Sequence, residues 1–393
     1  MHTHDSDIAI LGGGLAGGLI ALALARMRPD LRVVVIEAAE HFGGNHVWSC
    51  FASDVPEGAE WLIDPLTCAK WPGYDVRFPQ FQRRLDTPYR SLTGELLDSA
   101  LRAALPGDAL LTGLAVTGAT ANSVTLSDGG ALSAGGVIDA RGFAGLPGMT
   151  GGWQKFLGQT LRLNEPHGLS RPVVMDATVD QSDGYRFVYC LPFSEREVFV
   201  EDTYYADTSQ LDVPLLSARI ADYCAAAGWQ VEQIIRQETG VLPVVGRGDF
   251  AALWPQDDGL ARAGTRAGLF HPLTSYSLPT ALKLALHIAS LPDLSGKGLA
   301  TETRKFAARH WQSGSYYRML SAMLFGASDP PLRYRMLQRF YGLRPGLIER
   351  FYSGDSSVLD KLRILAGKPP IPIPAALSVL AGGRPLASLE NPA

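Results

Sequence analysis

Apolar residues near the start of the chain change their spacing twice within a short stretch. Ile8–Leu11 is a continuous apolar run, which is the pattern of a buried strand. The glycine-rich segment Gly12–Gly17 follows, and an alanine- and leucine-rich segment then predicts a helix that ends near Arg28. A second apolar run, Arg32–Ile36, closes on Glu37. The pattern therefore predicts a strand–helix–strand unit whose first turn is made of glycines.

The rest of the first 150 residues predicts a mixture of short elements. Residues 54–88 mix aromatic residues with prolines, and we expect this segment to be irregular. Ser91 or Thr93 can cap a helix that extends to about residue 105. After it we expect a meander of three short strands and then a buried strand that returns to the parallel sheet, at residues 109–111, 115–119, 123–126 and 137–142.

From residue 158 onward the pattern changes to the alternation of antiparallel strands. Strands are expected at 156–163, 173–177, 185–191, 198–203 and 229–237, with a helix at 215–227. Residues 243–246 lead back to the first domain, and Ser277 is a suitable N-cap for a helix at 280–291. Residues 301–380 are mostly helical in pattern. The predicted organisation is a first domain at 1–150, an inserted antiparallel-sheet domain at 151–245, a return to the first domain at 246–295, and a helical region at 296–393.

The composition excludes several classes of protein. The chain has 393 residues, 46% of them hydrophobic and 19% charged, which is typical of a globular protein with a large core. A net charge of -4 leaves no basic surplus for neutralising phosphates, so no nucleic-acid partner is expected. Four scattered cysteines form no C-x-x-C pair, and we predict no metal site. The uncharged run Ile8–Ala25 approaches the length of a membrane span, but its glycines and its initial strand argue against one.

The glycines at the first turn have the spacing of a dinucleotide-binding fingerprint. Gly12 permits the tight turn, Gly14 lets a pyrophosphate approach the backbone, and Gly17 lets the helix pack closely on the strand. The N-terminus of the helix, where Leu15 and Ala16 lie, offers unpaired N–H groups to the phosphates. Glu37 is placed to accept a hydrogen bond from a ribose hydroxyl. The alternative is a glycine-rich turn in some other kind of α/β protein.

A second glycine pair soon after Glu37 is expected where a long dinucleotide lies over a loop, and flavin adenine dinucleotide (FAD) requires such a loop. His46 and Trp48 follow it, either in contact with the flavin ring or packed in the interior. Arg266 is a candidate for a phosphate contact, although a surface arginine in a loop explains it as well. The full set predicted to bind the cofactor is Gly12, Gly14, Leu15, Ala16, Gly17, Glu37, Gly44, Asn45, Asp139, Arg266, Ser277 and Leu278.

Several segments together resemble one family, the bacterial lycopene β-cyclases. They are Gly12–Gly17, Asn45–Trp48, Glu201–Tyr205, Arg266–Pro272, Leu347–Tyr352 and Leu362–Leu365. The resemblance implies an α/β, Rossmann-like two-dinucleotide-binding flavoprotein fold with an inserted antiparallel-sheet substrate domain and a helical C-terminal region. It also implies bound FAD that is active when reduced, with NADPH or NADH as reductant. The implied reaction closes both ends of lycopene into β-rings through γ-carotene, without net electron transfer.

Such a reaction needs a strong acid in a dry pocket, because it begins when an alkene carbon is protonated. Glu201 and Asp202 are the candidates, and as neighbours on a strand their side chains point to opposite faces. One can face the substrate while the other faces the domain interface. Burial among hydrocarbon keeps a carboxyl protonated near neutral pH. We expect Glu201 to be the acid, or the relay to it, with Asp202 orienting its neighbours.

Alternatives to this assignment remain open from the residues alone. A solvated Glu–Asp pair at a strand end explains Glu201 and Asp202 without chemistry, and the reduced flavin is an alternative proton donor. Aromatic residues of the sheet can either line the substrate site or belong to the core; they are Tyr185, Phe187, Tyr204 and Tyr205.

Two other functions share the expected fold. One is an FAD-dependent monooxygenase or polyprenyl reductase, and the other is a carrier of prenyl groups without enzyme activity. Many flavin hydroxylases have a Gly-Asp pair where the chain returns to the cofactor domain. Residues 264–268 here lack that aspartate, which disfavours a hydroxylase.

Because lycopene resides in bilayers, we expect a cytoplasmic protein that binds the surface of the inner membrane. Basic and aromatic residues of the C-terminal helices are candidates for this contact, although helix packing explains them as well. They are Arg333, Arg335, Arg339 and Tyr341.

Overall fold

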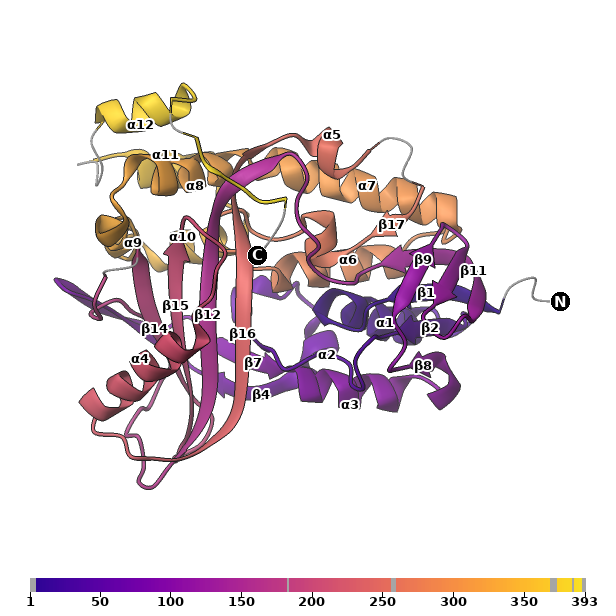
Figure 1. Cartoon of the computed structure of the whole chain (residues 1–393), viewed down its shortest axis with the longest axis horizontal. Coiled ribbons are helices and arrows are strands. Elements are labelled where there is room, and N and C mark those ends of the chain that lie inside the picture. Colours follow the sequence, from indigo (N-terminus) through magenta and orange to yellow (C-terminus); the bar gives the residue numbers. More distant parts are fainter. Residues whose placement is uncertain (1–4, 182–183, 256–258, 368–372, 384, 391–393) are drawn as a thin grey trace.

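A parallel sheet is built around the N-terminal strand–helix–strand unit (Figure 1). The computed structural model describes residues 5–181, 184–255, 259–367, 373–383 and 385–390. The parallel strands run in the order β8-β2-β1-β11-β17, and β10 and β9 extend the sheet as an antiparallel meander from β11. Their bounds are β1 Ser6–Leu11, β2 Val33–Ile36, β8 Leu110–Leu111, β9 Val116–Ala119, β10 Ser123–Leu126, β11 Ala131–Asp139 and β17 Ala261–Arg262.

Helices cover this sheet through apolar faces. The helix α1 (Leu15–Met27) packs against α3 (Gly94–Ala104) and α6 (Leu278–Ala289), and α7 (Gly296–Ser313) lies against β11 and β17. Thr93 caps α3 by accepting a hydrogen bond from the backbone N–H of Leu96 at 3.4 Å. The predicted caps at Thr93 and Ser277 are both at N-cap positions, although the Ser277 side chain makes no capping bond.

The second sheet is larger and stands beside the first (Figure 1). Its order is β16-β12-β15-β14-β13-β5-β6, antiparallel except where β13 pairs with β5, and β18 adds to β12. The helix α4 (Val213–Ala226) covers one face, and the other face looks towards the first sheet. The strand bounds are β5 Tyr74–Phe78, β6 Phe81–Leu85, β12 Met149–Leu163, β13 Val173–Asp176, β14 Tyr185–Pro192, β15 Glu197–Ala206, β16 Val231–Gly248 and β18 Ala387–Ser388.

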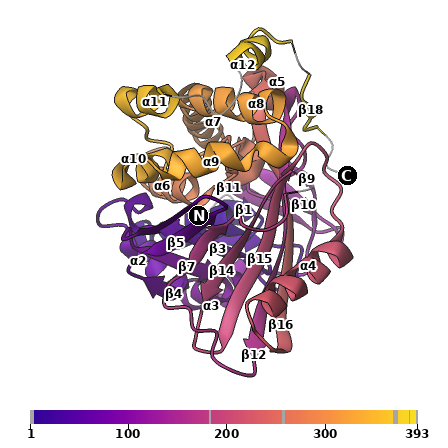
Figure 2. The ribbon, with the colours of Figure 1, turned by 90° about the vertical axis from the view of Figure 1, so that its left-hand side faces the viewer.

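A small sheet and a layer of C-terminal helices complete the fold. The small sheet has the order β3-β7-β4, with β3 Val47–Phe51, β4 Thr67–Trp71 and β7 Tyr89–Thr93. Figure 2 shows the C-terminal helices stacked above the larger sheet. The remaining helices are α2 Glu60–Ile63, α5 Phe250–Leu253, α8 Ser315–Ala327, α9 Tyr334–Tyr341, α10 Pro345–Tyr352, α11 Val358–Leu365 and α12 Ile373–Leu380.

The expectation that residues 54–88 are irregular is wrong. This segment forms α2, β4, β5 and β6, and β5 and β6 extend the larger sheet. Tyr74, Val76 and Phe78 are fully buried and alternate with the half-buried Asp75 and Arg77. The alternation is only five residues long, so prolines and aromatic residues nearby obscure it.

Three further boundaries differ from the sequence prediction. Residues 110–111 belong to the parallel sheet, where β8 pairs with β2, and β9, β10 and β11 make the meander. Glu201 and Asp202 lie inside β15, which continues to Ala206. Residues 231–248 form one long strand, and Pro243 is tolerated within it because β16 is at the edge of the sheet.

Two of the residues predicted to contact the membrane are buried. Arg333 is fully buried and forms an ion pair with Asp207 at 2.9 Å, and Tyr341 is buried with its hydroxyl 2.7 Å from that of Tyr352. Both stabilise the packing of the C-terminal helices on the larger sheet, so neither reaches a bilayer. Among the described residues, no helix combines the length and the hydrophobicity that a membrane crossing requires.

Candidate functional site

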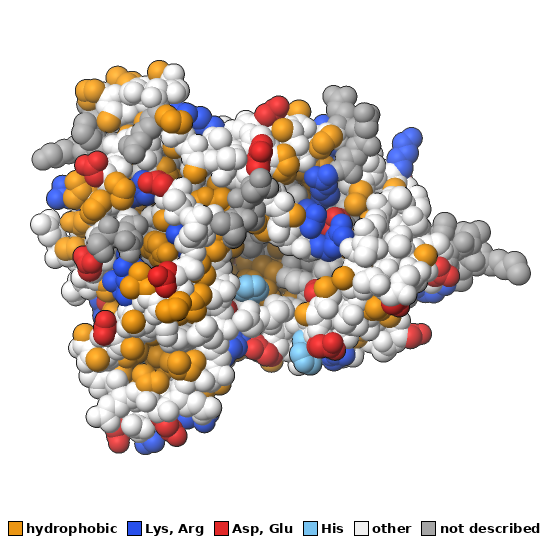
Figure 3. Space-filling model, in the orientation of Figure 1, with side chains coloured by type: hydrophobic (Ala, Val, Ile, Leu, Met, Phe, Trp, Pro, Cys, Tyr) orange, Lys and Arg blue, Asp and Glu red, His pale blue; other side chains and the backbone are white. Residues whose placement is uncertain are grey.

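A cavity of about 740 Å³ lies between the two sheets. One end is formed by the glycine turn after β1 and the end of β2, and the other by the inner face of the larger sheet. The space-filling view shows a hollow between the two halves of the molecule (Figure 3). The volume is within the usual range for cofactor and ligand pockets.

The glycines of the first turn have the separate roles that their spacing predicts. Gly12 has φ +92°, and a Cβ atom there would meet the carbonyl oxygen of Ala140 at 2.7 Å. A Cβ on Gly17 would lie 2.0 Å from the carbonyl oxygen of Gly12. A Cβ on Gly14 would meet nothing within 4 Å, because Gly14 faces the cavity. The position predicted to leave room for a ligand is therefore the one that opens into the cavity.

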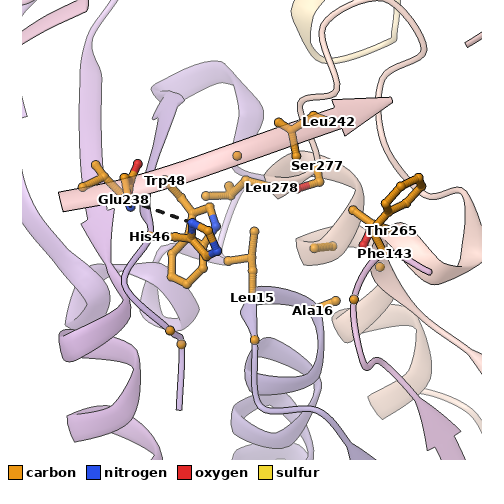
Figure 4. Close-up of a pocket in the computed structure, with 18 of the residues that line it drawn as sticks. Leu15, Ala16, His46, Trp48, Phe143, Glu238, Leu242, Thr265, Ser277 and Leu278 are labelled. Atoms are coloured by element: carbon orange, nitrogen blue, oxygen red, sulfur yellow. Dashed lines mark hydrogen bonds and ion pairs between the residues drawn. The ribbon is translucent and has the colours of Figure 1, made fainter. Parts of the chain in front are cut away.

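Glu37 and the first turn of α1 lie at this end of the cavity. The carboxylate of Glu37 accepts hydrogen bonds from the backbone N–H groups of Gly13, at 2.8 Å, and of Ala39, at 3.1 Å. These bonds hold the acid next to the glycine turn, and Glu37 still lines the cavity. Leu15 and Ala16 line it as well, and in Figure 4 Leu15 lies between His46 and Trp48 on one side and Ala16 and Thr265 on the other.

The loop that contains Gly44 is hydrogen-bonded to the larger sheet. Gly44 has φ +61° and lines the cavity together with His46 and Trp48. Asn45 is not among the lining residues, since its side-chain amide donates a hydrogen bond to the backbone carbonyl of Gln237 at 2.7 Å. Asn45 thus positions the loop instead of facing a ligand.

Asp139 and Arg266 also lie outside the cavity lining and bind each other. Asp139 accepts two hydrogen bonds from the guanidinium of Arg141, at 2.9 and 2.7 Å, and is 3.3 Å from Nε of Arg266. Burial alone would raise the pKa of Asp139, but Arg141 and Arg266 bring it below its ordinary value. Arg266 therefore has a carboxylate partner, and Arg141 is the arginine that lines the cavity.

The N-terminus of α6 reaches the cavity from the other side. Ser277 and Leu278 line it as predicted, and so does Tyr276. The Tyr276 hydroxyl donates a hydrogen bond to the carboxylate of Asp54 at 2.6 Å. Burial raises the pKa of Asp54 to about 6. The interaction joins α6 to the segment after β3.

Glu201 lies on the wall of the larger sheet at the far end of the cavity. It is 9% exposed, and its carboxylate accepts a hydrogen bond from the Thr203 hydroxyl at 2.5 Å. Burial raises its pKa to about 7, and the nearby charge of Asp202 acts in the same direction. A carboxyl in this state can release a proton and can also accept one near neutral pH.

Asp202 faces the opposite side of the sheet. Its neighbours on that face, Val200 and Tyr204, belong to the cluster packed against α4, so Asp202 does not face an interface with the first sheet. The carboxylate accepts three hydrogen bonds from the Arg186 guanidinium, the shortest at 2.6 Å. Asp202 is fully buried, and Arg186 is 7% exposed.

Several lining residues were not predicted from the sequence. The four aromatic candidates Tyr185, Phe187, Tyr204 and Tyr205 are not among the lining residues, which instead include Phe51, Tyr89, Phe156, Tyr189, Phe199 and Tyr352. Glu238 on β16 also lines the cavity and is 2% exposed. No local pattern sets Glu238 apart, since Glu232 and Arg236 are charged residues of the same strand.

The fold is shared with flavin-dependent enzymes of known structure, and the glycine turn lines the cavity between the two sheets. The structure matches a geranylgeranyl bacteriochlorophyll reductase-like protein from Thermoplasma acidophilum with a TM-score of 0.61, 14% identity, and coverage of 96% of this chain and 99% of that chain. It also matches a halogenase crystallised in complex with FAD, with a TM-score of 0.59, 15% identity, and coverage of 96% and 85%.

The chain belongs to the lycopene cyclase family. The model of that family, described as lycopene cyclase protein, matches residues 7–378. A lycopene beta-cyclase from Pseudescherichia vulneris is 48% identical over 93% of this chain and 95% of the relative, and one from Pantoea ananas is 44% identical over 95% and 97%. The resemblance seen in the sequence segments is thereby confirmed.

Proposed function

We propose that the protein is a lycopene β-cyclase that converts the linear ends of lycopene into β-rings by acid-initiated carbocation chemistry. Membership of the lycopene cyclase family supports this activity. The observation that carries the proposal is the position of Glu201, a buried carboxyl with a pKa near 7 at the end of the cavity away from the glycine turn. A hydrocarbon has no polar atom for the protein to bind, so the burial of its apolar surface must hold it in the cavity. A carboxyl must then supply the proton chemistry.

The residues at the glycine end fit FAD. Gly14 leaves open space at the N-terminus of α1, and Leu15 and Ala16 present the first turn of that helix to a pyrophosphate. Glu37 is held beside the same turn, where a ribose hydroxyl would lie. Gly44, Ser277 and Leu278 would contact the remainder of the cofactor. Reduced FAD, formed with NADPH or NADH, would supply negative charge near a developing cation.

The side chains of the larger sheet then perform the proton transfer. Phe156, Tyr189 and Phe199 form an aromatic wall beside Glu201, and aromatic faces stabilise a nearby cation. Glu201 exchanges a proton with the substrate, and the surrounding apolar side chains exclude water that would trap the cation as an alcohol. Asp202 acts from the opposite face, where its ion pair with Arg186 holds β14 and β15 together.

Expression in a lycopene-accumulating bacterium tests this proposal. The native chain is expected to convert red lycopene to γ- and β-carotene, which pigment chromatography resolves. Glu201→Gln is expected to leave lycopene unconverted because it removes the ionisable carboxyl. Glu197→Gln is the matched control, since Glu197 is on the same strand but is partly exposed and paired with Arg162. Loss of colour change in the control as well, or conversion by Glu201→Gln, would contradict the role of Glu201.

Stoichiometry separates a cyclase from a flavin monooxygenase or polyprenyl reductase of the same fold. Cyclisation leaves the molecular formula of the substrate unchanged, so reductant is needed only in catalytic amounts. A monooxygenase or reductase would consume one NAD(P)H for each product. Purified protein with a small amount of dithionite is therefore expected to complete many turnovers without oxygen.

We further propose that the protein binds the cytoplasmic surface of the inner membrane through α11. Val358, Leu359 and Leu362 are 71%, 77% and 60% exposed, and Leu377 on α12 is 60% exposed. Figure 3 shows hydrophobic side chains over these helices at the upper left. Exposed leucines on adjacent short helices are suited to insertion at a lipid interface, which is where the substrate resides.

A further inference from the structure

Four residues form a row across the inner face of the larger sheet. Tyr189 on β14 pairs with Glu201 on β15, Glu201 pairs with Gly158 on β12, and Gly158 pairs with Glu238 on β16. Side chains of directly paired residues lie on the same face of a sheet. Tyr189, Glu201 and Glu238 all line the cavity. The row therefore presents two carboxyls to the same space, with a glycine between them.

The separation of the two carboxyls suits two proton transfers on one substrate end. Two strand spacings of about 4.8 Å place the Cα atoms of Glu201 and Glu238 about 10 Å apart. Gly158 itself has no side chain, and the ring of Phe199 covers it, since a Cβ there would meet that ring at 2.4 Å and Cγ of Glu238 at 3.2 Å. Any larger residue at this position would displace the very side chains that shape the wall.

Glu238 is a buried acid with few neighbouring groups that would stabilise its negative charge. Its carboxylate accepts a hydrogen bond from the backbone N–H of Val47 at 2.7 Å, and Nδ1 of His46 lies 4.0 Å away. The dashed line in Figure 4 marks the pair of Glu238 and His46. Burial and the charge of Arg236 lower the pKa of His46, so this imidazole is neutral. Burial, reinforced by repulsion from Glu201, raises the pKa of Glu238 to about 9.

We propose that Glu238 is a second catalytic carboxyl, which forms an acid–base couple with Glu201 across Gly158. This inference rests on the cyclase activity proposed above. Pairs of carboxyls whose environments separate their pKa values commonly divide the acid and base roles. Glu238 has the higher pKa, so the proton rests on Glu238 while Glu201 is ionised. Glu238 is then the donor and Glu201 the acceptor, so of the two roles expected for Glu201 the couple gives it that of relay to the acid.

The proton balance of this couple closes within each cyclisation. The O–H bond of Glu238 breaks as a C–H bond forms at the terminal alkene carbon, which leaves a tertiary cation. The electron pair of a neighbouring double bond forms the C–C bond of the ring. A ring C–H bond then breaks, its proton passes to the carboxylate of Glu201, and its electron pair forms the ring double bond. Transfer of that proton from Glu201 to Glu238 restores the couple, because Glu238 has the higher proton affinity.

The groups around the couple determine its pH dependence. Glu201 faces Thr203 on its own strand and Tyr189 on β14, and Asp202 acts on it from the opposite face. Glu238 is influenced by Arg236 on β16, which forms an ion pair with Glu95 of α3, and by His46. The structure therefore predicts a bell-shaped rate profile with limbs near pH 7 and pH 9.

The test compares Glu201→Gln, Glu238→Gln and the double variant in the full-length protein reconstituted with FAD. The amide introduced by Glu238→Gln keeps an oxygen that accepts the hydrogen bond from the Val47 N–H, so flavin binding is expected to stay at the native value. The thermal midpoint is expected to be no lower than the native one, because the raised pKa of Glu238 costs the native protein stability. The initial rate of ring formation is expected to fall about 100-fold or more in each single variant. Because the two groups act as a unit, the double variant is expected to be no slower than either single one. Glu232→Gln, which removes an exposed carboxyl from the same strand, is the matched control.

An infrared titration gives a readout that does not depend on activity. The carbonyl band of protonated carboxylic acid is expected to persist in the native protein until about pH 9 and to disappear near pH 7 in Glu238→Gln. Native-like rates in Glu238→Gln, multiplicative losses in the double variant, or an unchanged infrared titration would each overturn the couple. If the native protein forms no ring product at all, the proposed function fails instead.

Discussion

The ion pair between Arg186 and Asp202 predicts that Asp202 is required for stability and not for the chemistry. Asp202→Asn removes the negative charge from a site where the carboxylate is fully buried and Arg186 is 7% exposed. Removing one member of a buried pair costs about 3–5 kcal/mol, because the remaining charge stays desolvated. Asparagine keeps one hydrogen-bond acceptor, so a loss of about 3 kcal/mol is expected. At roughly 2 °C per kcal/mol in large domains, the thermal midpoint should fall by about 6 °C.

Circular dichroism and flavin fluorescence during heating measure this effect. The second arm is a double-mutant cycle with Arg186→Met, Asp202→Leu and the combined Arg186→Met/Asp202→Leu variant. The combined variant should be more stable than either single one, since neither charge is left alone in the sheet. At a temperature well below the midpoint, the turnover per folded molecule of Asp202→Asn is expected to match the native rate.

The opposite pattern would refute this reasoning. If Asp202→Asn keeps the native thermal midpoint but loses turnover, Asp202 takes part in proton transfer despite facing α4. If the combined variant is as unstable as the sum of the single ones, the pair is not energetically coupled. Either result would require a path from Asp202 to the cavity that the contacts of β15 do not provide.

Three other predictions follow from the site and the surface. Glu201→Gln should be more heat-stable than the native protein at pH 8 and equally stable below pH 4.5. Folding raises the pKa of this acid from 4.5 to about 7, which costs the native protein roughly 3 kcal/mol in total as the pH rises through that range. Melting curves across pH measure the difference in stability, and a difference that does not change with pH would contradict the prediction. Gly14→Ala should keep the native thermal midpoint of the apoprotein but weaken FAD binding in a fluorescence titration. Gly17→Ala should lower the midpoint, because its Cβ would lie 2.0 Å from the Gly12 carbonyl oxygen. Equal effects of the two substitutions would exclude separate roles for the two glycines. The double substitution Leu359→Glu and Leu362→Glu should abolish sedimentation of the protein with vesicles of anionic lipids. The thermal midpoint should not change, because both side chains are mostly exposed. Continued sedimentation would exclude α11 as the membrane contact.

Parts of the site follow directly from local sequence. The strand–turn–helix at Gly12–Gly17 is determined by residues close together in the chain, since the backbone conformation of Gly12 and the close packing of Gly17 both arise within one supersecondary unit. The position of Glu37 follows because the second strand of that unit ends beside the first turn. Glu201 is identified by its strand and its family segment together.

Long-range contacts decide the position of other side chains. Asn45 and Arg266 each have a partner from a distant segment, Gln237 and Asp139, and neither is among the residues that line the cavity. Arginine is typical of protein surfaces, but Arg333 is buried and forms an ion pair with Asp207. No local pattern specifies such partners, because the two residues are brought together only when the sheets and helices pack.

The sequence by itself therefore determined the strand–turn–helix unit at the glycines, most of the strands and helices outside residues 54–88, and the family. Hydrophobic periodicity and glycine spacing are local properties, and they suffice for these features. Only the tertiary structure decided which face of β15 meets the cavity and that Glu238 lies two strands from Glu201. Strand register and sheet order depend on contacts between segments far apart in the chain, and these place the two carboxyls in one cavity.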